Sequence, residues 1–201
     1  MALSHCFRAT VESTTILNTD RLILRPWLAA DREPFARINR DPAVMEFMPA
    51  LLTAEESNSL VDRIEAHFEM HGFGLWAAEL RDPTRFIGYV GLAVPRFLPP
   101  FTPAVEIGWR LASDVWRQGL ATEAAHAVVR HAFESLHLSA LVSFTVPANL
   151  SSRSVMEKLD MTNDPSDDFD HPLLPEGHPL RRHVLYRLNH SAWQQAQAAG
   201  T

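Results

Sequence analysis

The chain has 201 residues, a formal net charge of -6 at pH 7 and a single cysteine, Cys6. This length suits one domain with a substantial core, and the negative charge argues against a nucleic-acid binder, which must neutralise phosphates. The lone cysteine excludes an internal disulfide and fits a reducing compartment, and no apolar run reaches the ~18–20 residues that span a membrane. We therefore expect a cytoplasmic protein that acts neither on nucleic acid nor in a membrane.

The two ends of the chain are expected to lie outside the domain. Residues 1–18 are mixed and polar, and they lack the apolar core of a secretory signal. We expect them to form a tail, residues 19–189 to form a single domain, and residues 190–201 to form a terminal helix or tail.

Before residue 100 the pattern alternates between strand and helix. The expected elements are a strand over 21–27, a helix over 33–39, a helix over 53–70, and a hairpin with strands over 75–80 and 86–93. Asp31 is expected to cap the first helix, and Thr53 with Glu56 forms a capping box for the second. Gly88 and Gly91 indicate a bulge or a close backbone contact in the hairpin.

After residue 100 strands and helices continue to alternate. The expected elements are a strand over 105–111, a long helix over 121–136, a strand over 141–146, a short helix ending at 159, a strand start near 161–162 and a last strand over 183–188. An acidic insertion over 163–181 precedes the last strand. The resulting order, β-α-α-β-β-β-α-β-α-β-β, predicts a mixed sheet with helices on both faces.

A short polar turn over 116–122 connects the strand over 105–111 to the long helix. Gly119 lets its backbone approach a ligand closely, and the start of the helix presents unpaired N–H groups and a positive dipole end to an anion. Thr122 adds a hydroxyl. The turn has neither the Gly-Lys-Ser/Thr of a Walker loop nor a Gly-x-Gly-x-x-Gly fingerprint, so it is a different kind of phosphate-binding candidate.

The same turn resembles the acetyl-CoA-binding motif of the GCN5-related N-acetyltransferases (GNAT), usually written Gln/Arg-x-x-Gly-x-Gly/Ala. Trp116, Gly119 and Ala121 stand at its first, fourth and sixth positions, and the tryptophan departs from the usual first residue. Asp160 departs from the glycine that usually ends the short helix of that family. Three further blocks look like the RimJ/RimL-type branch, namely residues 19–25, 106–111 and 149–159.

This resemblance implies a fold and a co-substrate. The fold is expected to be α/β (α+β), the GNAT acyl-CoA N-acyltransferase fold, with a mixed central sheet of about seven strands, helices on both faces and splayed fourth and fifth strands. Acetyl-CoA is the expected co-substrate, with no metal. In the family, the turn holds the pyrophosphate and the fourth strand pairs with the pantetheine chain. The residues that would bind it are Ile107, Trp109, Arg110, Leu111, Arg117, Gln118, Gly119, Leu120, Ala121, Thr122, Asn149 and Ser152.

Asn149 and Ser152 have two interpretations. Both residue types favour helix starts, so they would cap the short helix. In the interpretation that the resemblance implies, Asn149 bonds the pantetheine arm and Ser152 is catalytic, donating a hydrogen bond to the leaving sulfur. Met156 stands where many relatives have a tyrosine acid, and it cannot donate a proton, which favours Ser152.

Glu106 is the candidate catalytic base. It lies on the polar side of its strand and could accept a proton through water, although a structural carboxylate is the alternative interpretation. A protein N-terminal α-amine has a pKa of about 8, so it needs less help from a base than a lysine does. An N–H near Trp109 or Arg110 would polarise the thioester carbonyl.

The acceptor is expected to be a primary amine, foremost a protein N-terminal α-amine. A small-molecule amine and a catalytically silent CoA-binding domain are the alternatives, and either a monomer or a homodimer is expected, with the apolar segment 97–101 as a candidate interface. The polar residues in and after the insertion fit no metal motif and suggest an acidic substrate rim. They are His171, His178, His183, Asp167, Asp168 and Asp170.

Overall fold

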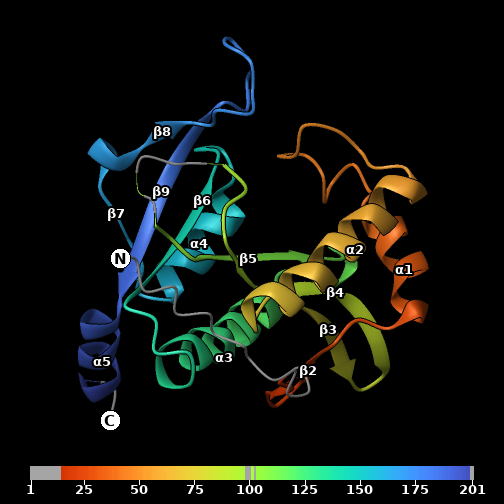
Figure 1. The fold of residues 1–201 in the computed structure, drawn as a ribbon, viewed down its shortest axis with the longest axis horizontal. Helices are drawn as coiled ribbons and strands as arrows, with labels where there is room; N and C mark the ends of the chain where they lie inside the picture. Colours follow the sequence, from red (N-terminus) through yellow and green to blue (C-terminus); the bar gives the residue numbers. More distant parts are fainter. Residues whose placement is uncertain (1–14, 98–100, 102, 200–201) are drawn as a thin grey trace, which may run out of the picture.

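The computed structural model describes residues 15–97, 101 and 103–199 of the protein. Figure 1 shows a central sheet with helices on either side. Most of the expected N-terminal tail falls outside the described residues. Leu17–Asn18 (β1), however, belongs to the sheet, so the ordered domain begins inside the segment that we expected to be a tail.

The other elements follow the expected order closely. The helices are α1 (Arg32–Ile38), α2 (Ala54–His71), α3 (Leu120–Glu134), α4 (Leu150–Lys158) and α5 (His190–Ala199). The strands are β2 (Leu22–Arg25), β3 (Leu75–Arg81), β4 (Thr84–Ala93), β5 (Glu106–Leu111), β6 (Ala140–Thr145), β7 (Thr162–Asn163), β8 (Phe169–Asp170) and β9 (Arg182–Asn189). The terminal segment therefore begins as a helix, as expected.

The strands form one mixed sheet in the order β1-β2-β3-β4-β5-β6-β9-β7, and β8 also pairs with β9. Every pair is antiparallel except β5 with β6, which is parallel. The sheet has nine strands rather than about seven because β1 and β8, which were not expected, each add a pairing of only two residues. The expected mixed α/β sheet is confirmed.

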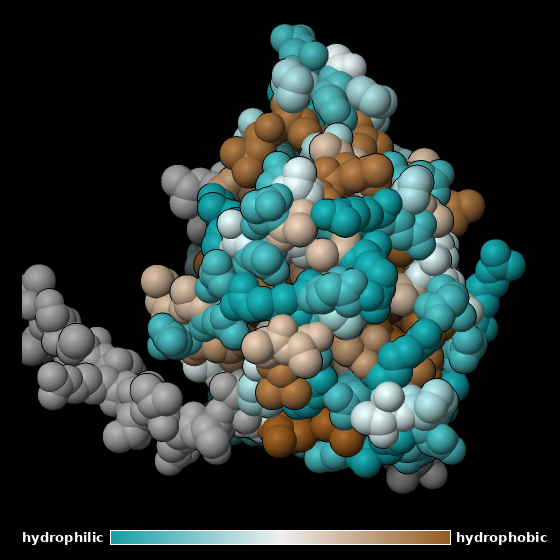
Figure 2. Space-filling model, turned by 90° about the vertical axis from the view of Figure 1, so that its right-hand side faces the viewer, coloured by the Kyte–Doolittle hydropathy of each residue, from teal (hydrophilic) through white to brown (hydrophobic). Residues whose placement is uncertain are grey.

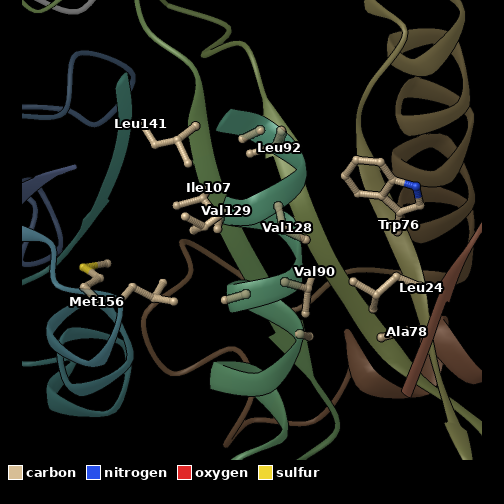
Figure 3. Close-up of a cluster of buried hydrophobic side chains, with 14 of the residues drawn as sticks. Leu24, Trp76, Ala78, Val90, Leu92, Ile107, Val128, Val129, Leu141 and Met156 are labelled. Atoms are coloured by element: carbon tan, nitrogen blue, oxygen red, sulfur yellow. The ribbon is translucent and has the colours of Figure 1, made fainter. Parts of the chain in front are cut away.

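Helices cover both faces of this sheet. The close-up in Figure 3 shows Val128 and Val129 of α3 beside Val90, Leu92 and Ile107 of the strands, and all five belong to the main buried cluster. Burying such side chains stabilises the fold by roughly 1.5–3 kcal/mol each. α1 and α2 cover part of the opposite face, and the buried side chains of this second cluster are Trp27, Phe35, Ile38, Val61, Ile64 and Ala77.

The outer side of α1 and α2 faces solvent. Figure 2 views this side and shows a mostly hydrophilic surface, with hydrophobic side chains gathered mainly near its ends. Arg32 at the start of α1 forms ion pairs with Asp62 and Glu65 of α2, at 2.7 and 2.8 Å. These helices therefore use one face for the sheet and the other for water.

The parallel strands β5 and β6 diverge after a single paired position. Glu106 pairs with Val142, the Val142 N–H donates to the Val105 carbonyl at 2.9 Å, and beyond this point no further register pair joins the two strands. Figure 1 shows them pointing apart. This gap corresponds to the expected splayed fourth and fifth strands.

Local conformations test several expectations. The capping box of Thr53 and Glu56 is confirmed at α2. Gly88 adopts a φ of +130° beside a register shift between β3 and β4, which is the expected irregularity of the hairpin. A side chain at Gly91 would lie 2.2 Å from the Gly74 carbonyl oxygen, which is the expected close backbone contact. Asp160 has a φ of 59°, the left-handed conformation that normally favours glycine.

Asp31 does not cap α1 through its side chain, which corrects the expectation. Its buried carboxylate instead accepts hydrogen bonds from the Arg25 guanidinium at 2.7 and 2.9 Å and from the Leu28 N–H at 2.8 Å. The guanidinium also bonds Glu79, and these two carboxylates outweigh its desolvation and raise the pKa of Arg25. A buried charge needs a partner more than a helix end needs a cap, so the ion pair prevails.

Candidate active site

The turn over 116–122 lies where β5 ends and α3 begins. Arg117 and Gly119 have φ values of 60° and 78°, and Gly119 is the N-cap residue of α3. Because glycine has no side chain to accept a hydrogen bond, the first turn of α3 is left uncapped. The alternating left-handed residues make the backbone N–H groups converge, as in other anion-binding turns.

The amides of this turn are available to a ligand. Across the described part of the chain, no backbone or side-chain acceptor bonds the N–H groups of residues 117–122. The first α3 amide with a partner is that of Glu123, which donates to the Gly119 carbonyl at 3.0 Å. The turn residues are also largely exposed, so a diphosphate can reach these donors from solvent.

Arg21 fixes the turn from the N-terminal side, a role that the sequence analysis did not assign. Its guanidinium donates to the Gln118 carbonyl at 2.8 Å and forms an ion pair with Glu123 at 2.6 Å. Burial acts to raise the pKa of Glu123, but hydrogen bonds from Thr19 and Arg21 outweigh burial, so the pKa is lowered. The carboxylate therefore stays charged and holds the arginine beside the turn.

The backbone of β5 presents a short open edge to the gap. The backbone N–H and C=O groups of its odd-numbered residues face β6. This follows because the carbonyls of Val105 and Ile107 accept hydrogen bonds from Val142 N–H and Ser143 Oγ, both at 2.9 Å. Ile107 therefore closes the base of the gap. Trp109 is the next residue whose backbone N–H and C=O face the opening.

Leu111 and Arg110 differ in the direction of their backbone N–H and C=O groups relative to the gap. The Leu111 carbonyl is taken by the Trp116 indole at 2.9 Å, which leaves its N–H on the open side. The backbone of Arg110 faces β4, like that of Ala112, whose N–H donates to Ile87 at 2.9 Å. Of the two N–H groups suggested for polarising a thioester carbonyl, the geometry favours that of Trp109.

The side chain of Arg110 turns away from the gap and holds the loop between α1 and α2. Its guanidinium donates to Asn39 Oδ1 at 2.6 Å, contacts Met48 Sδ at 3.2 Å and lies 5.7 Å from the centre of the Tyr89 ring. Asn39 is completely buried and donates to Ser57 Oγ at 2.9 Å. Asn39 gave no signal in the sequence because its partners are distant along the chain.

Asn149 and Ser152 start α4 beside the end of β6. Asn149 Oδ1 accepts a hydrogen bond from the Ser152 N–H at 3.1 Å, and its amide donates to Thr145 Oγ1 at 3.0 Å, so the capping interpretation is realised. The Ser152 hydroxyl has no hydrogen-bond partner among the residues that the structure describes, and it is partly buried. Met156 is 2% exposed and belongs to the core.

Glu106 lies at the base of the gap, on the sheet face opposite α3. Its Oε1 lies 3.9 Å from the point that a side chain on Gly108 would occupy, so the carboxylate extends over this glycine. Desolvation raises the pKa of Glu106 to about 8. The group is therefore mostly protonated at neutral pH and becomes a proton acceptor as the pH rises past that value.

The insertion over 163–181 is acidic, with Asp164, Asp167, Asp168, Asp170 and Glu176 against Arg181, but arginines neutralise two of these carboxylates. Asp167 pairs with Arg187 at 2.6 Å, and Asp170 pairs with Arg181 and Arg182 at 3.3 and 3.5 Å. These ion pairs reduce the negative charge of the expected acidic rim without removing it. Within the described residues no group of three potential metal ligands comes together.

The candidate interface over 97–101 is described only at its two ends. Phe97 and Phe101 both pack inward, with ring centres 5.9 and 6.1 Å from that of Phe144. They also line a largely apolar hollow of about 440 Å³ on the Glu106 side of the sheet. The other described residues of its lining are Val94, Pro95, Pro103, Ala104, Val105, Leu138, Ser139, Ala140, Val142 and Arg187.

A splayed parallel pair of strands that leads into an uncapped glycine turn defines the class of acyl-CoA-dependent acyltransferases. A family model described as an acetyltransferase (GNAT) domain matches residues 21–162. The chain therefore belongs to the GNAT acetyltransferases and is an acetyl-CoA-dependent N-acetyltransferase. No helix in the described residues is long and apolar enough to cross a membrane.

Individual relatives agree with this assignment. The chain is 30% identical over 161 residues to the FsC-acetyl coenzyme A-N(2)-transacetylase of Aspergillus fumigatus, covering 77% of this chain and 68% of that protein. An acetyltransferase from Agrobacterium tumefaciens has a TM-score of 0.71 at 28% identity and covers 90% of this chain and 98% of its own. A GNAT acetyltransferase from Bacillus anthracis has a TM-score of 0.73 at 21% identity, covering 88% and 99%.

Proposed function

We propose that this N-acetyltransferase acts on a protein N-terminal α-amine in the cytoplasm, by direct attack of the amine within a ternary complex. The amide bond forms as the carbon–sulfur bond breaks, the amine loses one proton, and the sulfur departs as a thiolate that is then protonated. Acetyl-CoA supplies the activated acetyl group. The free amides of residues 117–122 carry this proposal, because a diphosphate needs such donors.

The residues around the gap would divide the chemistry among them. The Trp109 N–H would donate to the oxygen that gains charge, and Ser152 Oγ would donate to the departing sulfur. Glu106 would accept the amine proton through water. Asn149 would support this arrangement mainly by holding the start of α4, where the positive end of the helix dipole also favours a thiolate.

The α-amine is favoured over a lysine side chain by the state of Glu106. A carboxyl group with a pKa of about 8 is a weak acceptor at neutral pH, because most of it is already protonated. An α-amine has a pKa of about 8 and is partly neutral at neutral pH. A lysine side chain with a pKa of about 10.4 would need a base that is already deprotonated at that pH.

Mass spectrometry of an acetylation reaction tests this proposal. Purified protein is incubated with acetyl-CoA and peptides that carry one free α-amine, one free lysine amine or neither. We expect acetylation at the α-amine. Tight CoA binding with no acetylated product and no thiol release from any amine would contradict the proposal and would point to a binding domain.

A small-molecule amine is the second candidate acceptor. It is favoured by the relative from Aspergillus fumigatus, whose name describes an N(2)-transacetylase that uses acetyl coenzyme A and which is 30% identical to this chain. Thiol release with free amines and no modification of peptides would support this candidate over the first.

A further inference from the structure

Six rings from four segments form one cluster beside the gap. Phe144 of β6 and Phe169 of β8 lie 5.5 Å apart between ring centres, and His183 of β9 lies 5.9 and 5.6 Å from them. His171 lies 5.1 Å from His183. The cluster is completed by Phe97 and Phe101. Only Phe169 is buried; the other five rings are partly exposed.

This ring cluster lies on the same sheet face as the candidate base. Glu106 pairs with Val142 in parallel register, so their side chains point to the same side of the sheet. Two residues further on, Phe144 points to that side as well and enters the region where β5 and β6 diverge. The position across from it on β5 is Gly108, which has no side chain. An acceptor that reaches Glu106 over Gly108 therefore passes the rings.

The two histidines offer one donor and one acceptor next to the ring faces. His183 Nδ1 lies 3.0 Å from the Arg181 carbonyl, which can only accept, so its Nε2 is left as an acceptor. His171 Nδ1 accepts from the Leu173 N–H at 3.3 Å, so its Nε2 carries the proton. Burial lowers the pKa of both rings, which keeps this neutral arrangement at neutral pH.

The charges around the cluster disfavour a second cation on the acceptor. Asp167 and Asp170 are paired with arginines, and the Asp168 carboxylate accepts from Asn163 at 2.9 Å. The Arg187 guanidinium already lies 5.7 Å from the centre of the Phe101 ring. A second cation on the acceptor would therefore meet Arg187 beside the cluster, whereas a neutral ring would meet the partly exposed phenylalanine and histidine rings.

We propose that the ring cluster recognises the part of the acceptor next to the amine, and that this part is aromatic. The proposal rests on the proposed function and adds a substrate class: amines with an aromatic ring within a few bonds of the nitrogen, preferably one that carries a hydroxyl or amide for the histidines. Such a group occurs in free arylalkylamines and in peptides that begin with an aromatic residue.

Thiol release from acetyl-CoA with four matched amines tests the proposal. Tyramine and phenethylamine carry the ring, 2-cyclohexylethylamine has similar size without aromaticity, and putrescine has a second cation. We expect kcat/KM for the aromatic amines to exceed that of the other two by about tenfold. Equal values for phenethylamine and 2-cyclohexylethylamine would overturn the proposal.

Two variants assign the preference to the cluster. Phe144→Leu should reduce the ratio of kcat/KM for phenethylamine over 2-cyclohexylethylamine about three- to tenfold, with an unchanged KM for acetyl-CoA. Phe86→Leu is the matched control, because Phe86 is also partly buried but packs against Trp27 at 5.4 Å on the α1 side. His171→Gln is a second cluster variant if Phe144→Leu does not fold. An unchanged ratio in a folded cluster variant would overturn the proposal.

Further arms separate failure of this proposal from failure of the proposed function. Turnover of putrescine without preference for aromatic amines contradicts only the substrate class. If no amine is turned over, calorimetric titration of tyramine into the CoA-loaded protein still decides, because absence of binding overturns the aromatic subsite. Comparing Tyr-Ala-Ala-Ala with Ser-Ala-Ala-Ala and with tyramine shows whether the ring is presented by a peptide or by a free amine.

Discussion

The environment of Glu106 shifts the pKa of its carboxyl group, and the pH dependence of the activity follows from this shift. Burial raises its pKa to about 8, so activity should increase with pH until this group and the amine are both deprotonated. Glu106→Gln should lower kcat/KM and remove one of the two ionisations from the pH profile. A profile identical to that of the wild type would exclude Glu106 as the base.

The same residue makes a separate prediction for stability. A carboxyl group whose pKa is raised on folding stabilises the native state at low pH and loses this contribution as the pH rises through the folded value. Replacing it by glutamine should therefore raise the melting temperature relative to the wild type more at pH 8.5 than at pH 5. Equal effects at both pH values would contradict the raised pKa.

Ser152 offers the donor to the departing sulfur. Hydrogen bonds to charged groups contribute about 1.5–3 kcal/mol, so Ser152→Ala should lower kcat about ten- to a hundredfold without weakening CoA binding in proportion. Ser151→Ala is the matched control, since Ser151 is exposed on the same turn of α4. Equal kcat values for the two variants would show that water stabilises the thiolate instead.

At the scale of elements, the loop between α1 and α2 is held over β5 by one buried amide. Asn39→Ala would remove the amide that bonds both the Arg110 guanidinium and Ser57, which costs about 1–3 kcal/mol of stability. Because this loop lies on the Glu106 face, we expect KM for the acceptor to rise while KM for acetyl-CoA stays unchanged. Melting curves and the two KM values check this prediction.

Asn58→Ala serves as the control for that variant, since it neighbours Ser57 on α2 and is partly exposed. It should leave both the melting temperature and the acceptor KM near the wild-type values. If Asn39→Ala raised the KM for acetyl-CoA instead of the KM for the acceptor, the loop would lie on the acetyl-CoA side of the site, which would contradict the prediction.

Local patterns explain which elements the sequence predicts well. The strand, turn and helix around Gly119 were predictable because period two, a glycine and period three to four follow one another within thirty residues. The capping box at Thr53 was predictable for the same local reason. The two-residue strands β1 and β8 carry no periodic signal, so the strand count was too low.

At the scale of the whole molecule, contacts between distant segments were not predictable. Arg110 and Asn39 are 71 residues apart, and nothing near either residue indicates the other. The ion pairs of the insertion over 163–181 were not predictable either, because β9 brings arginines such as Arg187 beside its aspartates. The ring cluster likewise exists only after four segments have folded together.

Binding of the acetyl-CoA diphosphate depends on the unoccupied backbone amides at the start of α3. Calorimetric titration of CoA and of 4′-phosphopantetheine, which lacks the diphosphate, into the wild type and Gly119→Val tests them directly. We expect CoA to bind the wild type much more tightly than 4′-phosphopantetheine, and we expect Gly119→Val to lose this difference, because a β-branched residue is strained at a φ of 78°. Equal affinity of the wild type for both compounds, or an unchanged difference in a folded Gly119→Val protein, would contradict the account.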